Sequence, residues 1–381
     1  MKKTIAVLYG GRSGEHEVSL VSAASVVRNL DPDKYEVKLI GIDTQGRWFL
    51  QGPQELERCR SGAASLGIQA QASMKIRVLP GGGMGEALST EGGQSLPVDV
   101  VFPVLHGTFG EDGTLQGLLE MADLPYVGAG VLGSAIGMDK EIAKALWIHG
   151  GLPTVPYIAV RALEWANKEK RNSLIERAER DFRYPLFVKP SRAGSSVGAA
   201  KASDRTALEK AVGGALGWDD KVLIEPFIPA REIECSVTGN DRYEAYTPGE
   251  IVPSHEFYDY DAKYTDPDGA KLLIPADLSE AELRTVREIA LRAYKIAELS
   301  GLARVDFFLN KNTSEILLNE VNTMPGFTTI SMFPKMCEAS GLAYGELLDR
   351  LINLAEERFM EKRNLHYSRE ADQNAKGGRS S

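Results

Sequence analysis

Residues 303–322 read ARVDFFLNKNTSEILLNEVN. An apolar run stands on either side of a polar turn at 310–314, and this pattern predicts a β-hairpin. Side chains along a strand alternate between its two faces, so Arg304 and Asp306 share one face of the first strand. The opposite face carries bulky apolar side chains such as Phe307, which predicts that it packs against a core.

Pairing of the two strands brings polar side chains together. With the turn centred near 312–313, antiparallel pairing places Asp306 opposite Glu320 and Arg304 opposite Asn322. Carboxylate and amide oxygens on a rigid sheet suit Mg²⁺, so Asp306, Glu320 and Asn322 are predicted metal ligands. The alternative is a surface hairpin whose polar face is merely solvated.

The residues after the hairpin favour the metal site over the solvated surface. Asn322 runs directly into Thr323-Met324-Pro325-Gly326. A Pro-Gly turn there brings backbone N–H groups close to the predicted metal site, where they can bind an anion. Together with the bulky opposite face, this turn makes the metal site the better hypothesis.

The composition bounds the class of protein. A chain of 381 residues with 43% hydrophobic and 25% charged residues is expected to form two or three globular domains. The net charge of −9 argues against a nucleic-acid or anionic-membrane partner, since either would need an excess of basic residues. Three widely spaced cysteines predict no disulfide framework, and no apolar run approaches a membrane span or a signal-peptide core. We therefore expect a cytoplasmic protein.

The N-terminal part predicts a parallel α/β unit. An apolar strand at 5–9, a glycine-rich turn at 10–14, a helix at 18–30 and a strand at 37–42 form a βαβ opening. Residues 98–105 are nearly all apolar, as in a buried parallel strand. Ligands gather at the carboxyl ends of such strands, so both following turns are expected in one crevice.

The rest of the chain predicts two further mixed units and a tail. Small residues near 128–137 mark the first boundary, and the strand at 222–228 closes the second unit. The predicted division is 1–128, 129–226 and 227–360, with a polar, disordered tail at 361–381. The fold class is thus α/β and α+β, in three domains.

Two lysines and one glutamate suggest a nucleotide site, each weakly. Lys189 ends a strand beside a Gly/Ser loop at 193–198, which is how phosphate-binding loops look, although a plain surface loop is as compatible. Lys140 opens a helix, where most lysines are solvated. Glu225 lies in an apolar strand, and its partner is either an adenine amino group or, more ordinarily, an internal Lys or Arg.

Five motifs in this order resemble the D-alanine–D-alanine ligase family of the ATP-grasp superfamily, from Gly10 to about Arg358. They are EHEVS at 15–19, HGTFGEDGTLQG at 106–117, KPS at 189–191 with GSSVG at 194–198, FYDYDAKY at 257–264, and the hairpin with its turn at 304–326. The resemblance implies a two-domain ATP-grasp fold after the first domain. It also implies ATP-dependent ligation of two D-alanines through a D-alanyl phosphate, for peptidoglycan precursor synthesis.

By this resemblance, ATP lies between the central and C-terminal domains. The implied ATP-binding residues are Lys140, Lys189 and Lys263 at the phosphates, Ser196 in the Gly/Ser loop, Glu225, Phe227 and Ile228 at the adenine, and Glu232 at the ribose. Asp306, Glu320 and Asn322 hold two Mg²⁺ ions, with Mn²⁺ as a substitute.

The resemblance also assigns the substrate contacts. Glu17 receives the ammonium of the first D-alanine, and Ser195 and Tyr264 hydrogen-bond toward Glu17 to close the loops over the substrates. Arg304 and the N–H of Gly326 stabilise the tetrahedral oxyanion. His106 and Ser331 contact the substrates, with Ser331 at the second carboxylate. The partners are two D-alanines and ATP, with no nucleic acid and no membrane, in an expected homodimer.

Three rival functions are open at this point. A D-alanine–D-lactate ligase shares the fold, but family members that make the ester tend to carry another residue at the position of Tyr264. A dinucleotide-dependent oxidoreductase would use the glycines at 10–14, which lack the G-x-G-x-x-G spacing. A non-catalytic nucleotide-binding regulator would be expected to lack one residue of the hairpin set, which is complete.

Overall fold

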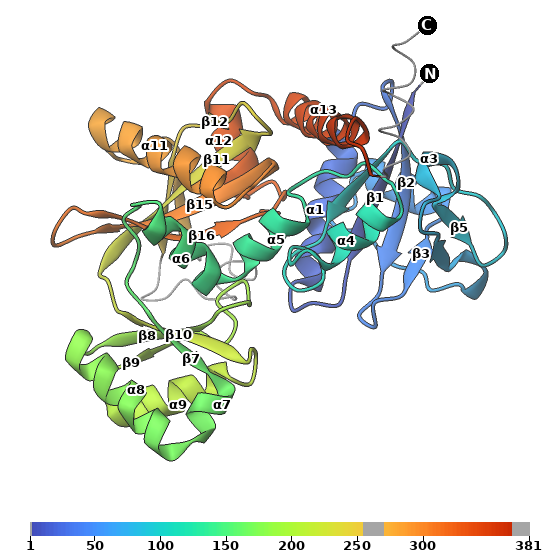
Figure 1. The fold of residues 1–381 in the computed structure, drawn as a ribbon. Coiled ribbons are helices and arrows are strands. Elements are labelled where there is room, and N and C mark those ends of the chain that lie inside the picture. Colours follow the sequence, from blue (N-terminus) through green and yellow to red (C-terminus); the bar gives the residue numbers. More distant parts are fainter. Residues whose placement is uncertain (1, 254–269, 368–381) are drawn as a thin grey trace, which may run out of the picture.

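The computed structural model describes residues 2–253 and 270–367. Its strands form three larger sheets and one small one, and each larger sheet comes from a separate stretch of chain (Figure 1). The predicted mixed α/β fold class is confirmed. Within the described ranges, none of the helices has both the length and the apolar composition that a membrane crossing needs.

The first sheet has the order β3-β2-β1-β6, in which β1 pairs with β2 and β6 in parallel. Residues 5–9 of β1 are fully buried because the sheet is covered on both faces. β1 ends at Gly10, whose φ of +90° and a hypothetical Cβ 2.3 Å from the Ile42 carbonyl oxygen require glycine. Because β1 and β6 pair in parallel, their carboxyl ends lie side by side, which is where the two turns were expected to meet. The elements are β1 (Lys3–Gly10), α1 (His16–Asn29), β2 (Tyr35–Ile42), β3 (Trp48–Leu50), β6 (Val100–Val104) and α4 (Thr114–Met121).

An excursion between β3 and β6 carries the small sheet. β4 and β5 pair antiparallel within it. Its elements are α2 (Pro53–Arg60), η1 (Ala72–Met74), β4 (Ile76–Val78), α3 (Gly83–Glu86) and β5 (Leu88–Thr90).

The second sheet is antiparallel, with the order β7-β10-β8-β9, and its helices lie on one face (Figure 1). That face forms a separate apolar core. The other face is left for the cavity described below. The elements are β7 (Ile158–Arg161), α7 (Ala162–Ala166), α8 (Lys168–Asp181), β8 (Leu186–Pro190), β9 (Ala200–Ala202), α9 (Arg205–Ala215) and β10 (Lys221–Pro226).

The third sheet has the order β14-β13-β11-β15-β16, and β12 pairs with β11. Its core joins β11 and β15 to α11 and to α6. Lys140 opens a helix as expected, and this helix, α6, packs on the third sheet rather than on the second. The elements are α5 (Val131–Met138), α6 (Lys140–His149), β11 (Ala230–Gly239), β12 (Glu244–Ala245), β13 (Gly249–Pro253), β14 (Ala270–Leu273), α11 (Glu280–Ile296), β15 (Gly301–Asn310), β16 (Ile316–Asn322), α12 (Met332–Ala339) and α13 (Tyr344–Arg363).

The hairpin of β15 and β16 has the predicted register. Asp306 lies opposite Glu320 and Arg304 opposite Asn322. The pairing shifts, unexpectedly, between Asp306 and Phe307: Phe307 pairs with Leu318, and Asn319 is left unmatched. Such a bulge turns an extra side chain toward one face.

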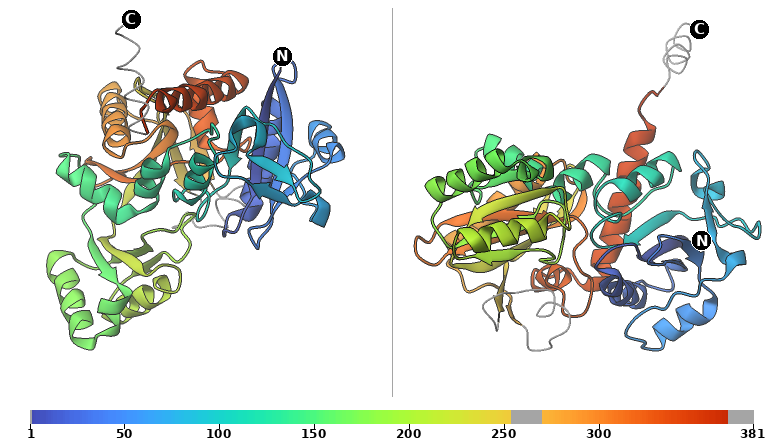
Figure 2. Two further views of the ribbon diagram at one scale, coloured as in Figure 1. Left: turned by 45° about the vertical axis from the view of Figure 1, so that its right-hand side comes forward. Right: turned by 90° about the horizontal axis from the view of Figure 1, so that it is seen from below.

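Helix α13, near the C-terminal end of the described residues, packs against the N-terminal unit. It runs between the third sheet and the first unit (Figure 2), and its apolar face shares one core with β1. Arg358 donates to the carbonyls of Tyr126 and Gly128 and to Ser300, while Lys3 pairs with Glu356 at 2.7 Å. The predicted tail at 361–381 begins inside this helix, and its last 14 residues lie outside the described ranges.

Candidate active site

A cavity of about 1520 Å³ lies between the three units. Fifteen of the predicted site residues line it: Glu17, His106, Lys140, Lys189, Ser195, Ser196, Phe227, Ile228, Glu232, Arg304, Asp306, Glu320, Asn322, Gly326 and Ser331. Glu225 does not line it, and Lys263 and Tyr264 lie outside the described residues. The cavity thus collects residues from four of the five sequence motifs, and the motif at 257–264 lies outside the described residues.

The polar face of the hairpin forms one wall. Arg304 grips Asp306 through two hydrogen bonds of 2.7 and 2.6 Å, and Glu320 lies 3.4 Å from the ammonium of Lys140. Glu234, on the neighbouring strand β11, is in register with Asp306 and lies 3.1 Å from Arg304. A row of three carboxylates therefore crosses three strands, and the cations of Arg304 and Lys140 offset part of its charge.

The donor set of this wall fits Mg²⁺. Asp306, Glu320 and Asn322 offer hard oxygen donors from paired positions of two strands. Within the described ranges, no group of three or more His, Cys, Asp or Glu side chains is arranged to hold a metal. Two carboxylates and one amide leave coordination positions for phosphate oxygens and water, which is usual for Mg²⁺.

Glu225 lies behind the cavity wall and is held by internal lysines. Its carboxylate lies 2.8 Å from Lys144 and 3.0 Å from Lys189. Burial alone would raise the pKa of Glu225, but the two ammonium groups outweigh it and hold that pKa below its usual value. Of the two partners considered for this side chain, the structure shows the internal lysines, and the adenine contact stays a prediction. Lys189 also donates to the bulge residue Asn319 at 2.8 Å.

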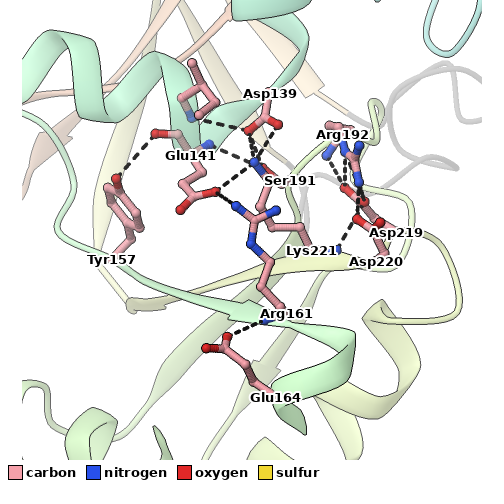
Figure 3. Close-up of polar contacts among 11 residues, drawn as sticks. Asp139, Glu141, Tyr157, Arg161, Glu164, Ser191, Arg192, Asp219, Asp220 and Lys221 are labelled. Atoms are coloured by element: carbon pink, nitrogen blue, oxygen red, sulfur yellow. Dashed lines mark hydrogen bonds and ion pairs between the residues drawn. The ribbon is translucent and has the colours of Figure 1, made fainter. Parts of the chain in front are cut away.

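Lys140 opens α6, where a polar network joins Asp139, Glu141, Ser191 and Lys221 (Figure 3). Its backbone N–H donates to the Ser191 carbonyl at 3.0 Å, and its ammonium donates to the Ala193 carbonyl at 2.8 Å. Beside it, the buried Lys221 binds both Asp139, which caps α6, and Glu141. The network ties the helix start to the end of β8, so Lys140 and the Gly/Ser loop share one support.

The Gly/Ser loop has an unusual backbone. Ser195 and Ser196 have φ angles of +49° and +58°, a region that non-glycine residues seldom adopt. At the loop base, Arg192 binds Asp219 and Asp220 (Figure 3). Such backbone conformations persist where the surroundings hold them and are common at ligand sites.

Ser195 contacts Glu15, and this corrects one prediction. The Ser195 hydroxyl donates to the Glu15 carboxylate, whereas the expected partner was Glu17. Glu15 is buried directly before α1, whereas Glu17 is exposed on its first turn. A Cβ at either Gly107 or Gly194 would lie 2.7 Å from the Glu15 carboxylate, so two glycines let their loops close over it.

His106 is buried and uses both ring nitrogens within the protein. Nδ1 lies 2.8 Å from the Met324 carbonyl, so it carries the proton, and Nε2 lies 3.2 Å from the Ser22 hydroxyl. Burial lowers the pKa of His106, which keeps the ring neutral. Nearby, burial raises the pKa of Glu111 to about 8, and the Glu15 carboxylate adds to the effect.

Gly326 and Ser331 lie against each other. A Cβ at Gly326 would stand 2.7 Å from the Ser331 hydroxyl oxygen, so only glycine fits without displacement. That hydroxyl is also bonded to Thr328, accepting from its N–H at 3.0 Å.

Four site residues escaped the sequence analysis: Glu15, Glu111, Glu234 and Asn319. Glu15 and Glu111 stand inside motifs quoted there, so a signal was present but the side chain was not singled out. Glu234 is 5% exposed in β11, two residues after Glu232, and the sequence of this strand does not mark which of the two carboxylates is buried. Asn319 had no signal, because nothing in the local sequence marks the bulge.

Comparison with known proteins identifies the family. A model of the D-ala D-ala ligase N-terminus matches residues 4–129, and one of the D-ala D-ala ligase C-terminus matches residues 146–353. The chain belongs to the D-alanine–D-alanine ligase family. This membership sets aside the oxidoreductase alternative.

Relatives in this ligase family match over nearly the whole chain. The D-alanine–D-alanine ligase of Treponema denticola is 54% identical over 368 residues, covering 96% of this chain and 100% of its own length. The solved D-alanine–D-alanine ligase of Coxiella burnetii is similar at a TM-score of 0.80 and 39% identity, with 95% and 96% of the chains covered. The solved VanG D-Ala:D-Ser ligase of Enterococcus faecalis follows at 0.79 and 35%, with 93% and 100% covered.

Proposed function

We propose that the protein uses ATP to join two D-alanine molecules into D-alanyl-D-alanine, through a D-alanyl phosphate, for peptidoglycan precursor synthesis. The observation that carries this proposal is one cavity in which Arg304, the oxygen ligands of the hairpin and two phosphate-facing lysines meet the buried Glu15. We assign the domains to residues 1–128, 129–226 and 227–360, although the helices α5 and α6 pack on the sheet of the third domain, and we assign the working form to a homodimer.

ATP occupies the part of the cavity between the second and third sheets. Lys140 and Lys189 face its phosphates, together with Lys263, and Ser196 contacts them from the Gly/Ser loop. Phe227 and Ile228 flank the adenine and Glu232 binds the ribose, while Glu225 acts indirectly by holding Lys189.

Asp306, Glu320 and Asn322 hold two Mg²⁺ ions, which Mn²⁺ can replace. Bound Mg²⁺ neutralises the phosphate charge and orients the transferred phosphoryl group. Arg304, which grips Asp306 here, lies at the same wall and therefore next to the reacting centre.

Glu15 takes the role that the sequence analysis gave to Glu17. Its buried carboxylate receives the ammonium of the first D-alanine, which leaves the substrate carboxylate toward Arg304. Ser195 holds Glu15 and closes the Gly/Ser loop over the substrate, with Tyr264 as the second closing residue.

The reaction has two steps. A substrate carboxylate oxygen attacks the γ-phosphorus and releases ADP, which gives an acyl phosphate. The amine of the second D-alanine, held through Ser331 and beside His106, then attacks the acyl carbon and displaces phosphate. Arg304 and the Gly326 N–H stabilise the oxyanion of that attack, and the closed loops exclude water that would hydrolyse the acyl phosphate.

The experiment that tests this function is ADP release against a panel of D- and L-amino acids and D-lactate. We expect rapid ADP release with D-alanine alone and D-alanyl-D-alanine as the main product by mass spectrometry. D-serine belongs in the panel because a D-Ala:D-Ser ligase shares the fold. Preferred formation of a mixed dipeptide or of an ester at neutral pH would contradict the proposal.

A second prediction separates the two candidate carboxylates at the start of α1. Glu15→Gln removes a buried charge beside the ammonium, and truncating one partner of such a pair costs about 2 kcal/mol or more, roughly 30-fold in the KM for the first D-alanine. Glu17→Gln is the matched control, because its exposed side chain is expected to change that KM by less than about threefold. Steady-state kinetics with varied D-alanine decide it, and the reverse order of effects would restore Glu17.

A further inference from the structure

The turn at 323–327 links β16, which carries Asn322, to the helix α12. Thr323, Met324 and Phe327 of this turn are buried, and Gly326 lines the cavity. The inference below rests on the proposed role of the Gly326 N–H as an oxyanion donor. What holds this turn in place then decides where that N–H lies.

Side chains of the first unit hold the turn on both sides of Gly326. The Met324 N–H donates to Glu111 at 2.7 Å, and the Met324 carbonyl accepts from His106 at 2.8 Å. The Phe327 N–H donates to the Ser22 hydroxyl at 3.3 Å. Three backbone groups of the third unit are thus bound by residues more than 200 positions earlier in the chain.

Glu111 bridges the two units with one carboxylate. Its first oxygen accepts from Met324, and its second accepts from the Gly107 N–H at 2.6 Å. The side chain is 7% exposed, so water does not substitute freely for either bond. Both of its oxygens accept from backbone N–H groups, and these two donors favour the ionised carboxylate against the burial that raises its pKa to about 8.

We infer that Glu111 is a positioning residue for amide-bond formation: by holding the Met324 N–H, it sets the place of the Gly326 N–H relative to Arg304. The geometry of an oxyanion site matters steeply, since a displacement of about 1 Å can cost ~10²-fold in rate. The first unit thereby contributes to the oxyanion site although the donors themselves lie in the third.

Glu111→Gln tests this inference with little change of shape. A glutamine offers one accepting oxygen and one NH₂ group, so either Met324 or Gly107 loses its acceptor and faces another donor. We expect kcat to fall by ~10- to 100-fold, while the KM for ATP stays within about twofold because the nucleotide residues are untouched. Glu111→Asp, which keeps two accepting oxygens, is expected to recover part of the rate.

A tetrahedral analogue separates positioning from general loosening. We would measure the inhibition constant of a phosphinate dipeptide analogue, whose phosphorus imitates the tetrahedral centre. Affinity for such an analogue follows kcat/KM when a substitution acts on the transition state. We expect Glu111→Gln to lower both by the same factor, whereas a purely structural defect would change the thermal unfolding midpoint without this proportionality.

Asp112→Asn is the matched control. Asp112 is the next residue, and its carboxylate accepts from Phe109 at 2.8 Å and from Thr114 at 3.0 Å, both within its own loop. Asp112→Asn loosens that loop but leaves the turn at 323–327 in place, so kcat is expected to change by less than about threefold. An equal loss in the two variants would overturn the inference.

Two further variants keep every outcome decisive. If Glu111→Gln does not fold, Ser22→Ala takes its place, because it removes the acceptor of the Phe327 N–H. It must lower kcat/KM and the affinity for the analogue by the same factor, or the inference is wrong.

Arg304→Met in the same assay tests the proposed oxyanion site itself. Loss of analogue affinity in Arg304→Met alone overturns the role of Glu111 and leaves the proposed function intact; no loss in either variant overturns the oxyanion site and the inference with it.

Discussion

Glu320→Ala is expected to reduce D-alanine-dependent ADP release by about 10³-fold or more. Metal coordination supplies several kcal/mol of charge stabilisation in phosphoryl transfer, and each 1.4 kcal/mol is a factor of about ten. Asp306 and Asn322 alone would leave the proposed metal site with one carboxylate. The fold is expected to persist, because Glu320 belongs to a row of like charges and its removal leaves Lys140 its bond to the Ala193 carbonyl.

The measurement has three parts. ADP release reports activity, urea unfolding reports stability, and binding of Mn²⁺ in the presence of a non-hydrolysable ATP analogue reports the metal site directly. Glu315→Ala, at an exposed position of the same hairpin, is the control and is expected to keep all three. An unchanged Mn²⁺ affinity of the Glu320→Ala protein would show that Glu320 is not a metal ligand.

Arg304→Met is expected to lower kcat/KM for D-alanine by ~10²- to 10³-fold, the usual effect of losing one oxyanion donor. The guanidinium is held in a fixed orientation by Asp306 and by Glu234, so it is ready to donate without rearrangement. Arg304→Lys restores a charge but not the planar fork, so it is expected to recover only part of the loss.

The kinetic pattern distinguishes this role from a contribution to ATP binding. We expect the KM for ATP to change little, with the loss concentrated in kcat, because an oxyanion donor acts in the transition state. A large rise in the KM for ATP with an unchanged kcat would assign Arg304 to the nucleotide instead. Unfolding by urea is the companion measurement, since Asp306 and Glu234 lose a cation partner.

The hairpin was predictable from the sequence because its signals are local. A strand period of two and a short polar turn determine which side chains face each other, and Asp306 lies opposite Glu320 as expected. The bulge at Asn319 was not predictable, since an unmatched residue leaves the alternation intact on either side. Through the bulge, Asn319 lines the cavity together with Glu320, and its side-chain oxygen accepts a hydrogen bond from Lys189.

The choice between Glu15 and Glu17 depends on tertiary structure. Both flank the start of a helix, and spacing alone does not tell which one faces the loops that arrive from Gly107 and Gly194. The same limit applies to Glu111, whose partner Met324 lies 213 residues away. Glu225 is intermediate: burial required a partner, and the sequence left open whether that partner was adenine or a lysine such as Lys144.

Helix α13 has a consequence for how the chain folds during synthesis. Its leucines at 347, 348 and 351 complete the same core as Ile5 and Val7 of the first strand. On a ribosome, the first sheet is made before this helix, so the apolar surface that the helix covers stays exposed until the helix has emerged. Closing so long a loop adds little entropy per extra residue, but the exposed interval makes the nascent N-terminal unit prone to aggregation, which chaperones counter.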